Sequence, residues 1–459
     1  MKRAGQYVFH SFDGGVSCSG ELLKVENSSE LALEIEGKRI ARGAGMSFSA
    51  ASFDNGTTSI DVRGLKRIVF LDTTSRTVKV EAGVSIGRLL DFLLANGFSL
   101  PVLPGYPTIT IGGCIAANAH GKNPLKDSTI LDRVETFLLH HVDIGEIEVS
   151  RSTNSELFDL TVGGCGLTGT ILSVTLRVSP VSNRWARVSV EPIYDLCQLP
   201  GLLTNSEGND FVVSWHDFNQ TGGRFGSGFI EKGKIIPSSS NSNLSSSQEL
   251  ILPVKEEHRI DSIMTLRAES RGQNFPTLWS HLTLVGAMNS VYTSIQSWRC
   301  GSHRLERIED CIFPNKNLRD LYFHGFGKRG LFEHQIILVK DAFPEYVERV
   351  RWWLSRNELP ITMASGKGFS GETRYLRFSK DGICFALDFP RCEQGQRFLS
   401  YLDGLVMKLG AIPNIFKDSR LPPEVVAKTY PDYELFRKRL KEFDPKGRYG
   451  SELSARLEL

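Results

Sequence analysis

Residues 108–123, TITIGGCIAANAHGKN, form the most informative segment of this chain. Two adjacent glycines follow a β-branched run, and small residues then lead into His-Gly-Lys-Asn. Glycine and alanine let a backbone approach a ligand closely, because a larger side chain would fill the space of the ligand. The histidine and the lysine place a titratable ring and a cation beside that ligand. The segment therefore indicates a binding turn.

Two further glycine-rich segments support this interpretation, RGAGMSF at residues 42–48 and VGGCGLTG at residues 162–169. The first is typical of a turn whose successive N–H groups form an anion-binding concavity. A Rossmann fingerprint that opens a helix inside a βαβ unit is missing, and so is the GxxxxGKS/T phosphate loop. One such turn is more often an ordinary surface turn. Three glycine-rich segments flanked by strand-like runs favour a large phosphorylated cofactor.

Length and composition limit the class of protein. The chain has 459 residues, more than one core usually supports, so we expect two domains, either consecutive or interleaved. Its 41% hydrophobic and 23% charged residues are typical of a globular protein, and a net charge of +2 gives no reason to expect nucleic acid. No apolar run reaches the roughly 18 residues of a transmembrane helix, and the N-terminus lacks the apolar core of a signal peptide.

The eight cysteines are scattered without the paired spacing of a metal site, which predicts reduced thiols in a cytoplasmic protein. The adjacent His140 and His141 are a weak metal signal, and we expect no metal site.

The first 180 residues predict a compact α/β unit. Residues 67–72 and 77–82 read as neighbouring strands. Ser85 suits an N-cap, apolar residues follow at helical spacing, and Gly97 suits the position after the helix. Residues 169–178 alternate apolar side chains and read as a further strand.

The rest of the chain mixes short strands with longer helices. The expected strands are residues 211–215, 335–339 and 412–416. The expected helices are residues 343–356, residues 398–409 ended by Gly410, and residues 434–443. Residues 237–248, PSSSNSNLSSSQ, are too polar for a core element and predict a mobile surface loop. The FRKRLK run of the last helix favours a solvated face over a membrane-surface patch.

Four segments in order, RGAGMSFS, VEAGVSIGRLLDFL, LPGYPTITIGGCIAANAHGKN and ELFDLTVGGCGLTGTI, resemble the vanillyl-alcohol oxidase superfamily of FAD-dependent oxidoreductases. HGKN, CGLTG, KDSR at residues 417–420 and SARLEL at residues 454–459 resemble its decaprenylphosphoryl-β-D-ribose 2-oxidase branch. The resemblance is close at both ends of the chain and loose in the middle.

The resemblance implies a two-domain α+β fold of the vanillyl-alcohol oxidase type. Residues 1–182 would form the FAD-binding domain, residues 406–459 would complete it, and residues 183–405 would be an inserted α+β substrate domain. The residues expected at the cofactor are Ala41, Arg42, Gly43, Ala44, Gly45, Met46, Ser47, Phe48, Ser49, Ala50, Ala51, Gly105, Thr110, Ile111, Gly112, Gly113, Ala117, Asn118, Ala119, His120, Cys165, Ile171 and Asn414.

The bond between protein and flavin is expected to be non-covalent. In covalent members a histidine tethers the flavin at the position that Met46 holds here. His120 is the remaining candidate for a tether, but the resembled branch carries the same histidine without such a bond.

The resemblance also implies the chemistry, which is oxidation of a secondary sugar alcohol with hydride transfer to the flavin. Lys417 and His120 are the expected catalytic residues. Lys417 would either take the hydroxyl proton or hold the developing alkoxide as a cation. The residues expected at the substrate are Lys122, Trp215, Glu333, Gln335, Lys367 and Ala386.

Three departures from the branch leave the substrate open. Glu333 replaces a neutral glutamine, and its carboxylate repels a phosphodiester unless Lys122 or Lys367 balances it. Phe48 replaces a tyrosine. Ala386 replaces a cysteine opposite the flavin, and Cys384 would face the same side of that strand.

The leading hypothesis is oxidation of a polyprenyl-phosphate-linked sugar to a keto-sugar, as the first half of an epimerisation in cell-envelope polysaccharide synthesis. A partner NAD(P)H-dependent reductase would complete the epimerisation, and membrane association would be at most peripheral, at the inner face. One alternative is a flavin oxidase or dehydrogenase of a soluble polyol or aldonolactone. Another is an FAD-binding protein that has lost its substrate chemistry.

Overall fold

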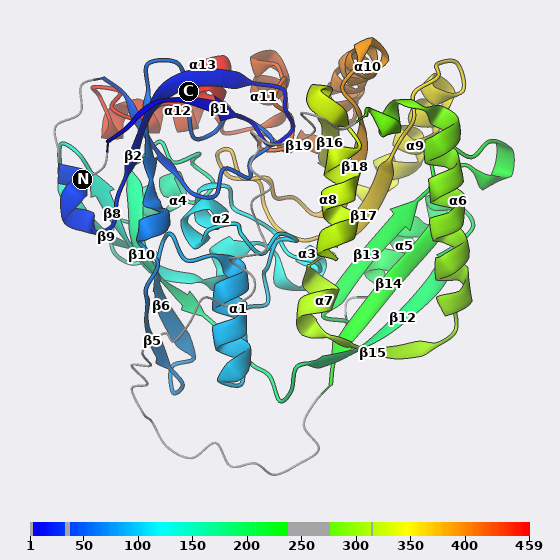
Figure 1. Ribbon diagram of the computed structural model, residues 1–459, viewed down its shortest axis with the longest axis horizontal. Coiled ribbons are helices and arrows are strands. Elements are labelled where there is room, and N and C mark those ends of the chain that lie inside the picture. Colours follow the sequence, from blue (N-terminus) through cyan, green and yellow to red (C-terminus); the bar gives the residue numbers. More distant parts are fainter. Residues whose placement is uncertain (1–2, 33–36, 207, 237–275, 314) are drawn as a thin grey trace.

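A computed structural model describes residues 3–32, 37–206, 208–236, 276–313 and 315–459 (Figure 1). The expected loop at residues 237–248 lies outside these ranges. Within them, β-sheets and α-helices mix throughout, in agreement with the expected α+β class. The small sheets and helix α1 occupy one side of the molecule, and a large sheet occupies the other.

Two sheets make up most of the N-terminal part. The first has the order β1 (Arg3–His10), β2 (Ser17–Lys24), β4 (Thr58–Asp61), β3 (Arg39–Arg42). The second has the order β5 (Ile68–Asp72), β6 (Thr77–Glu81), β10 (Thr170–Arg177), β8 (Val134–His141), β9 (Gly145–Ser150). The strands predicted at residues 67–72, 77–82 and 169–178 are therefore confirmed, and the first two pair antiparallel as neighbours.

Helix α1 (Ile86–Ala95) packs on the second sheet as predicted. The Ser85 hydroxyl accepts from the backbone N–H of Arg88, and Gly97 follows the helix with φ of +77°. Its leucines are buried in one core with the second sheet, because they recur at helical spacing on one face.

The large sheet has eight antiparallel strands within the described ranges. Their order is β15 (His303–Arg307), β12 (Trp185–Ile193), β14 (Gly228–Ile235), β13 (Phe211–His216), β17 (Met363–Phe369), β18 (Gly382–Pro390), β16 (Leu331–Leu338), β19 (Ile412–Pro413). A short antiparallel pair is formed by β7 (Phe98–Ser99) and β11 (Ser179–Pro180).

Helices cover the sheets and end the chain. The three predicted ones are α9 (Phe343–Leu354), α10 (Glu393–Leu409), which ends at left-handed Gly410, and α12 (Tyr433–Phe443). The others are α2 (Ile111–Ala116), α3 (Pro124–Asp127), α4 (Ser155–Thr161), α5 (Leu199–Thr204), α6 (Leu282–Arg299), α7 (Ile308–Ile312), α8 (Lys316–His324), α11 (Pro423–Thr429) and α13 (Glu452–Arg456). No helix in the described ranges combines the length and apolar character needed to cross a bilayer.

The strand predicted at residues 412–416 is wrong in length, since β19 ends at Pro413. The Asn414 side-chain oxygen accepts from the backbone N–H of Phe416, and the Asn414 carbonyl accepts from the N–H of Lys417. Asparagine side chains commonly close turns in this way. The chain therefore turns at Asn414, and Lys417 lies on the turn.

The C-terminal segment contacts both sides of the molecule. Strand β19 pairs with β16 at the edge of the large sheet. The N–H groups of Glu452 and Leu453 donate to the carbonyls of Phe53 and Ala50, beside the first glycine-rich segment. These contacts support the proposed grouping of residues 406–459 with residues 1–182, and the boundaries at 182 and 405 stay predictions.

A buried carboxylate joins three distant segments around the Lys417 turn. Asp13 is 1% exposed, and its Oδ2 accepts from Arg391 Nη2 and from Ser419 Oγ, each at 2.5 Å. The backbone N–H of Leu331 donates to the Asp13 carbonyl. The N-terminal loop, the large sheet and the turn are thus held at one point.

Replacing Asp13 by asparagine is expected to lower the free energy of unfolding by about 3 kcal/mol, because Arg391 then keeps a partly buried charge without its partner. Urea denaturation measures this as a lower midpoint with an unchanged slope. Asp310→Asn, on the surface of α7, is the control and should change little. A loss below about 1 kcal/mol would place the Asp13 pair among ordinary surface ion pairs.

Candidate active site

The first glycine-rich segment follows β3 and leaves its backbone open. Among the residues that the structure describes, the N–H groups of residues 44–47 donate to no protein acceptor. Gly45 has φ of +66°, which only glycine adopts readily. Successive free N–H groups in such a turn bind anions. The segment therefore fits a cofactor phosphate.

The first and second glycine-rich segments meet at Gly43. A Cβ atom on Gly43 would lie 2.2 Å from Thr110 Oγ1, and that hydroxyl caps α2 by accepting from the Gly113 N–H. Gly112 is also closely packed, since its Cβ would lie 3.0 Å from the Ala82 Cβ. The glycines at residues 43 and 112 are therefore required by the approach of neighbouring segments as well as by a ligand.

The third segment joins the same cluster from the other side. The N–H groups of Gly163 and Cys165 donate to the carbonyls of Ile115 and Ala116, at the end of α2. Cys165 itself has φ of +59° and is buried. The three segments, far apart in sequence, thus form one surface around α2.

Asn118 marks a ligand position in that surface. Its side chain is 2% exposed, its φ is +45°, and neither Nδ2 nor Oδ1 has a partner in the described part of the chain. A buried amide without partners costs free energy, and native structures rarely contain one. A bound group that offers both a donor and an acceptor, as a flavin ring does, would satisfy it. The site therefore fits the expected cofactor.

Not every expected cofactor residue points its side chain at this surface. The Arg42 guanidinium packs over Phe9 and Phe53 and donates to Ser52, and burial lowers the pKa of Arg42 to about 10. Ile171 lies in the core behind the second sheet. Only the backbone of such residues is available to a ligand.

Five of the six expected substrate residues share one face of the large sheet, and the sixth, Lys122, lies in the loop beside β13. Trp215 on β13 is opposite Ser365 on β17, and Ala386 on β18 is opposite both Ser365 and Gln335 on β16. Lys367 and Glu333 lie two residues from this row along their own strands, so they project from the same face. Four strands thus contribute to one surface.

The Lys417 turn connects this face to the first glycine-rich segment and the residues that follow it, residues 42–51, which we call the cofactor loop. Lys417 Nζ lies 3.1 Å from Glu333 Oε2 and 4.2 Å from the centre of the Phe48 ring. Asn414, at the start of the turn, donates its N–H to the Gln335 carbonyl and its amide to Gln335 Oε1. The carbonyl of Phe416 accepts from the N–H groups of Phe48 and Ser49. The lysine is therefore held between the cofactor loop and the sheet.

His120 and Lys367 share one acceptor. His120 Nδ1 and Lys367 Nζ each lie 3.2 Å from the Gly121 carbonyl oxygen. Burial lowers the pKa of His120 to about 3, and the charge of Lys367 acts in the same direction. The imidazole is neutral at physiological pH and donates through Nδ1. Burial also lowers the pKa of Lys367, to about 8.

Lys122 is the second cation of this region. Burial lowers its pKa, while Glu231 on β14 opposes that shift. No carboxylate lies within ion-pair distance of Lys122 or Lys367 in the described ranges. Two partly buried ammonium groups on one side of the site thus lack carboxylate partners within ion-pair distance.

The comparison with known proteins identifies the cofactor. A family model described as an FAD binding domain matches residues 24–142, which contain the first two glycine-rich segments. The chain is an FAD-dependent oxidoreductase. The decaprenylphosphoryl-beta-D-ribose oxidase of Mycolicibacterium smegmatis is 26% identical over 433 residues, which cover 92% of this chain and 89% of that relative. The expected resemblance to the vanillyl-alcohol oxidase superfamily and to this branch is confirmed.

Other relatives match a shorter part of the oxidoreductase. The Delta(24)-sterol reductase of Homo sapiens is 27% identical over 151 residues, 32% of this chain and 29% of the relative. The D-lactate dehydrogenase of Archaeoglobus fulgidus is 29% identical over 164 residues, 35% of this chain and 36% of the relative.

Sequence reasoning missed Asp388, which lies opposite Glu333 on β18. It is 1% exposed, its Oδ2 accepts from the Tyr322 hydroxyl at 2.8 Å, and its Oδ1 has no partner among the described groups. Burial and the neighbouring Glu333 carboxylate raise the pKa of Asp388 well above its usual range. The signal was available, since Asp388 follows Ala386 by two residues and so shares its face.

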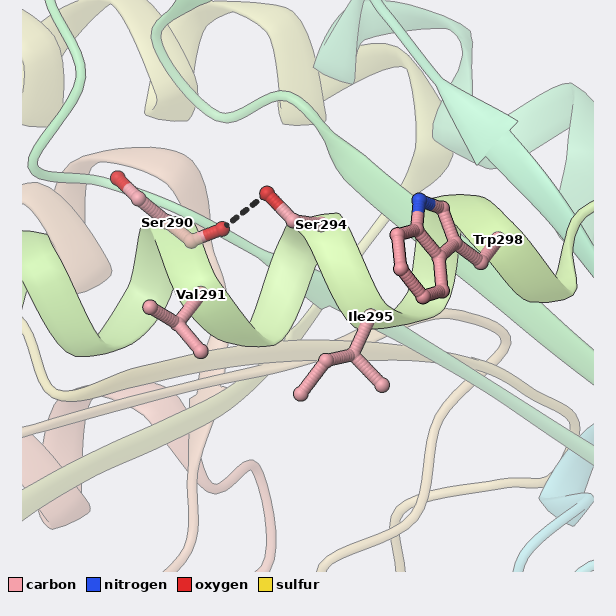
Figure 2. Close-up of a pocket in the computed structure, with 5 residues that line it drawn as sticks. All are labelled: Ser290, Val291, Ser294, Ile295 and Trp298. Atoms are coloured by element: carbon pink, nitrogen blue, oxygen red, sulfur yellow. Dashed lines mark hydrogen bonds between the residues drawn. The ribbon is translucent and has the colours of Figure 1, made fainter.

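A hollow on the outer face of α6 lies apart from this site (Figure 2). It measures about 270 Å³ and is lined by Ser290, Val291, Ser294, Ile295 and Trp298. None of the expected site residues lines it. On its inner face, α6 contributes Tyr292, whose ring lies 5.1 Å from that of Trp215.

Gly43→Ala is expected to lower FAD retention of the purified oxidoreductase at least tenfold, because the new methyl group displaces Thr110 and separates the first two segments. The ratio of flavin absorbance to protein absorbance measures retention. Gly404→Ala on α10 is the control, since a Cβ there meets no atom within 4 Å. Full FAD retention by the Gly43→Ala variant would show that FAD does not bind at the junction of the first two segments.

Proposed function

We propose that the oxidoreductase oxidises a secondary hydroxyl of a sugar carried on a polyprenyl phosphate, yielding a keto-sugar as the first half of an epimerisation in cell-envelope polysaccharide synthesis. The observation that carries this proposal is a pair of partly buried ammonium groups without carboxylate partners, Lys367 on the sheet face near Lys417 and Lys122 in the loop beside β13. A partner NAD(P)H-dependent reductase would return the keto-sugar to an alcohol of inverted configuration.

The charge of the lysine pair favours a phosphorylated substrate over a neutral polyol. Buried ammonium groups without partners are costly, and a phosphate supplies several charge-assisted acceptors at once. Glu333 does not cancel this charge, because its Oε2 is engaged by Lys417. The phosphate of the substrate would therefore lie at Lys122 and Lys367, with the sugar toward Lys417.

The protein residues orient the alcohol and handle charge, while FAD supplies the two-electron acceptor when bound. Lys417 is placed to stabilise negative charge that develops on the reacting oxygen. Neutral His120 and the amide of Gln335 are placed to orient neighbouring hydroxyl groups. The whole arrangement supports oxidation at a carbon next to the cofactor loop.

Anaerobic mixing of the holoenzyme with a polyprenyl-phosphate pentose is expected to bleach the flavin absorbance. Free pentoses, polyols and aldonolactones at the same concentration should leave it unchanged, because they lack the phosphate that pairs with Lys122 and Lys367. Bleaching by free sugars at least as fast as by the lipid-linked sugar would favour a soluble substrate instead. A flavin that no sugar reduces would overturn the proposed oxidation.

Lys417→Met is expected to lower the rate of flavin reduction by about 10²–10³, the loss typical of removing one oxyanion-stabilising donor. FAD content should stay at the wild-type level, since the Lys417 side chain contacts Glu333 on the substrate side of the cofactor loop. Stopped-flow absorbance measures the rate. Lys428→Met, at an exposed position of α11, is the control, and a Lys417 variant with wild-type rate would exclude this role.

Affinity for a short polyprenyl phosphate is expected to fall as the pH rises through about 8, because Lys367 loses its charge there. An arginine keeps its charge over this range, so Lys367→Arg should bind with little dependence on pH. Isothermal titration of the holoenzyme from about pH 6 to pH 9 measures this. Identical profiles of the two proteins would show that Lys367 does not contact the phosphate.

A further inference from the structure

Two groups that stabilise an ammonium ion contact Lys417 Nζ. The Glu333 carboxylate lies 3.1 Å from Nζ, and the face of the Phe48 ring lies 4.2 Å away. An anion and an aromatic face both stabilise an ammonium ion. An ammonium ion has no lone pair with which to take a proton. The oxidation of an alcohol therefore needs a second group as base.

Glu333 has a free oxygen for this purpose. Its Oε2 is engaged by Lys417, and no hydrogen bond reaches Oε1 from any residue that the structure describes. Glu333 projects from the same sheet face as Gln335, which is two residues along β16 and bonded to the Lys417 turn. Oε1 is thus beside the ammonium that would hold the substrate oxygen.

Other groups on this face are less suited to accept the proton. His120 is a weak base, because burial lowers its pKa to about 3. Burial and the Glu333 carboxylate raise the pKa of Asp388 well above its usual range, which favours its neutral form. Lys367 is a cation below about pH 8. The Tyr322 hydroxyl donates to Asp388, and burial raises its pKa. Neighbouring carboxyl groups with opposed protonation states commonly divide acid and base roles.

We propose that Glu333 is a catalytic residue that takes the hydroxyl proton of the substrate through Oε1, while Lys417 remains an ammonium ion and holds the oxygen. This inference rests on the proposed function, because it assumes an alcohol substrate at Lys417. It assigns to this chain a base that the glutamine of the resembled branch does not supply.

The step balances in atoms and electrons. The O–H bond breaks and its proton forms a bond to Glu333 Oε1. The carbon–hydrogen bond breaks with both electrons and the carbon–oxygen double bond forms, so that the alcohol is oxidised by two electrons. FAD, when bound, would supply the acceptor of that hydride. The Glu333 carboxylate becomes a carboxylic acid, and the raised pKa of Asp388 disfavours a second negative charge beside it.

The test compares wild type with Glu333→Gln and Glu333→Asp as holoenzymes. The rate of anaerobic flavin reduction by a polyprenyl-phosphate pentose should show an acidic limb for wild type, because a general base must be deprotonated to take a proton. Glu333→Gln should lose this acidic limb and slow by about 10²–10⁴, the usual contribution of a general base. Glu333→Asp should keep the limb at a lower rate. Glu358→Gln, on the surface, is the matched control.

A second readout does not depend on turnover. The infrared difference spectrum of wild type minus Glu333→Gln, recorded on the oxidised holoenzymes at neutral pH without substrate, should show a carboxylate band. A protonated carboxyl band there would overturn the proposal, since Glu333 would already hold the proton. FAD content and thermal midpoint of each variant show whether it is folded.

The outcomes separate the inference from the proposed function. If the substrate does not reduce the flavin of the wild type, the proposed function is overturned. The infrared band still decides whether Glu333 is able to act as a base. If the substrate reduces the flavin of the wild type, and the Glu333→Gln variant keeps both the rate and the acidic limb, only the role of Glu333 is overturned. If the Glu333→Gln variant loses the acidic limb while it retains FAD, both the proposed function and the role of Glu333 are supported.

Discussion

The turn that begins at Asn414 is the constraint on which the site depends. Its first residue is bonded to Gln335 of the large sheet, its Phe416 carbonyl is bonded to the cofactor loop, and Ser419 is bonded to buried Asp13. A long lysine side chain loses considerable rotamer entropy when it is fixed. The ordered turn and the contacts of Nζ limit that loss, so Lys417 is already positioned before substrate binds.

The charges of the site are arranged along the sheet face rather than balanced at one point. Lys417 and Glu333 form an ion pair at β16, whereas Lys122 and Lys367 lie toward β13 and β17 without carboxylate partners. This separation explains how a carboxylate at position 333 is compatible with a phosphorylated substrate. Under the proposed function, the anionic part of the ligand would meet the lysines without carboxylate partners, and the reacting hydroxyl would meet the ion pair.

Sequence reasoning recovered most regular elements because their signals are local. Strand alternation at β5, β6 and β10, the Ser85 cap and the left-handed Gly410 all follow from neighbouring residues. The strand expected at residues 412–416 was wrong in length because the Asn414 side chain turns the backbone after Pro413. The spacing of Asp388 to Ala386 places it on the same strand face, but its position opposite Glu333 depends on the pairing of β18 with β16, which no local pattern reveals.

The sequence by itself determined the cofactor class and the set of residue types at the site. Glycine at positions 43 and 45 and the TITIGGC turn constrain the backbone directly, and motif order then indicates FAD. Only the tertiary structure decided which charges meet. Residues 48, 333 and 417 are far apart in the chain, and their contacts exist because β16, the cofactor loop and the C-terminal turn fold against one another. Electrostatic interactions depend on distance and burial, and neither is encoded in local sequence.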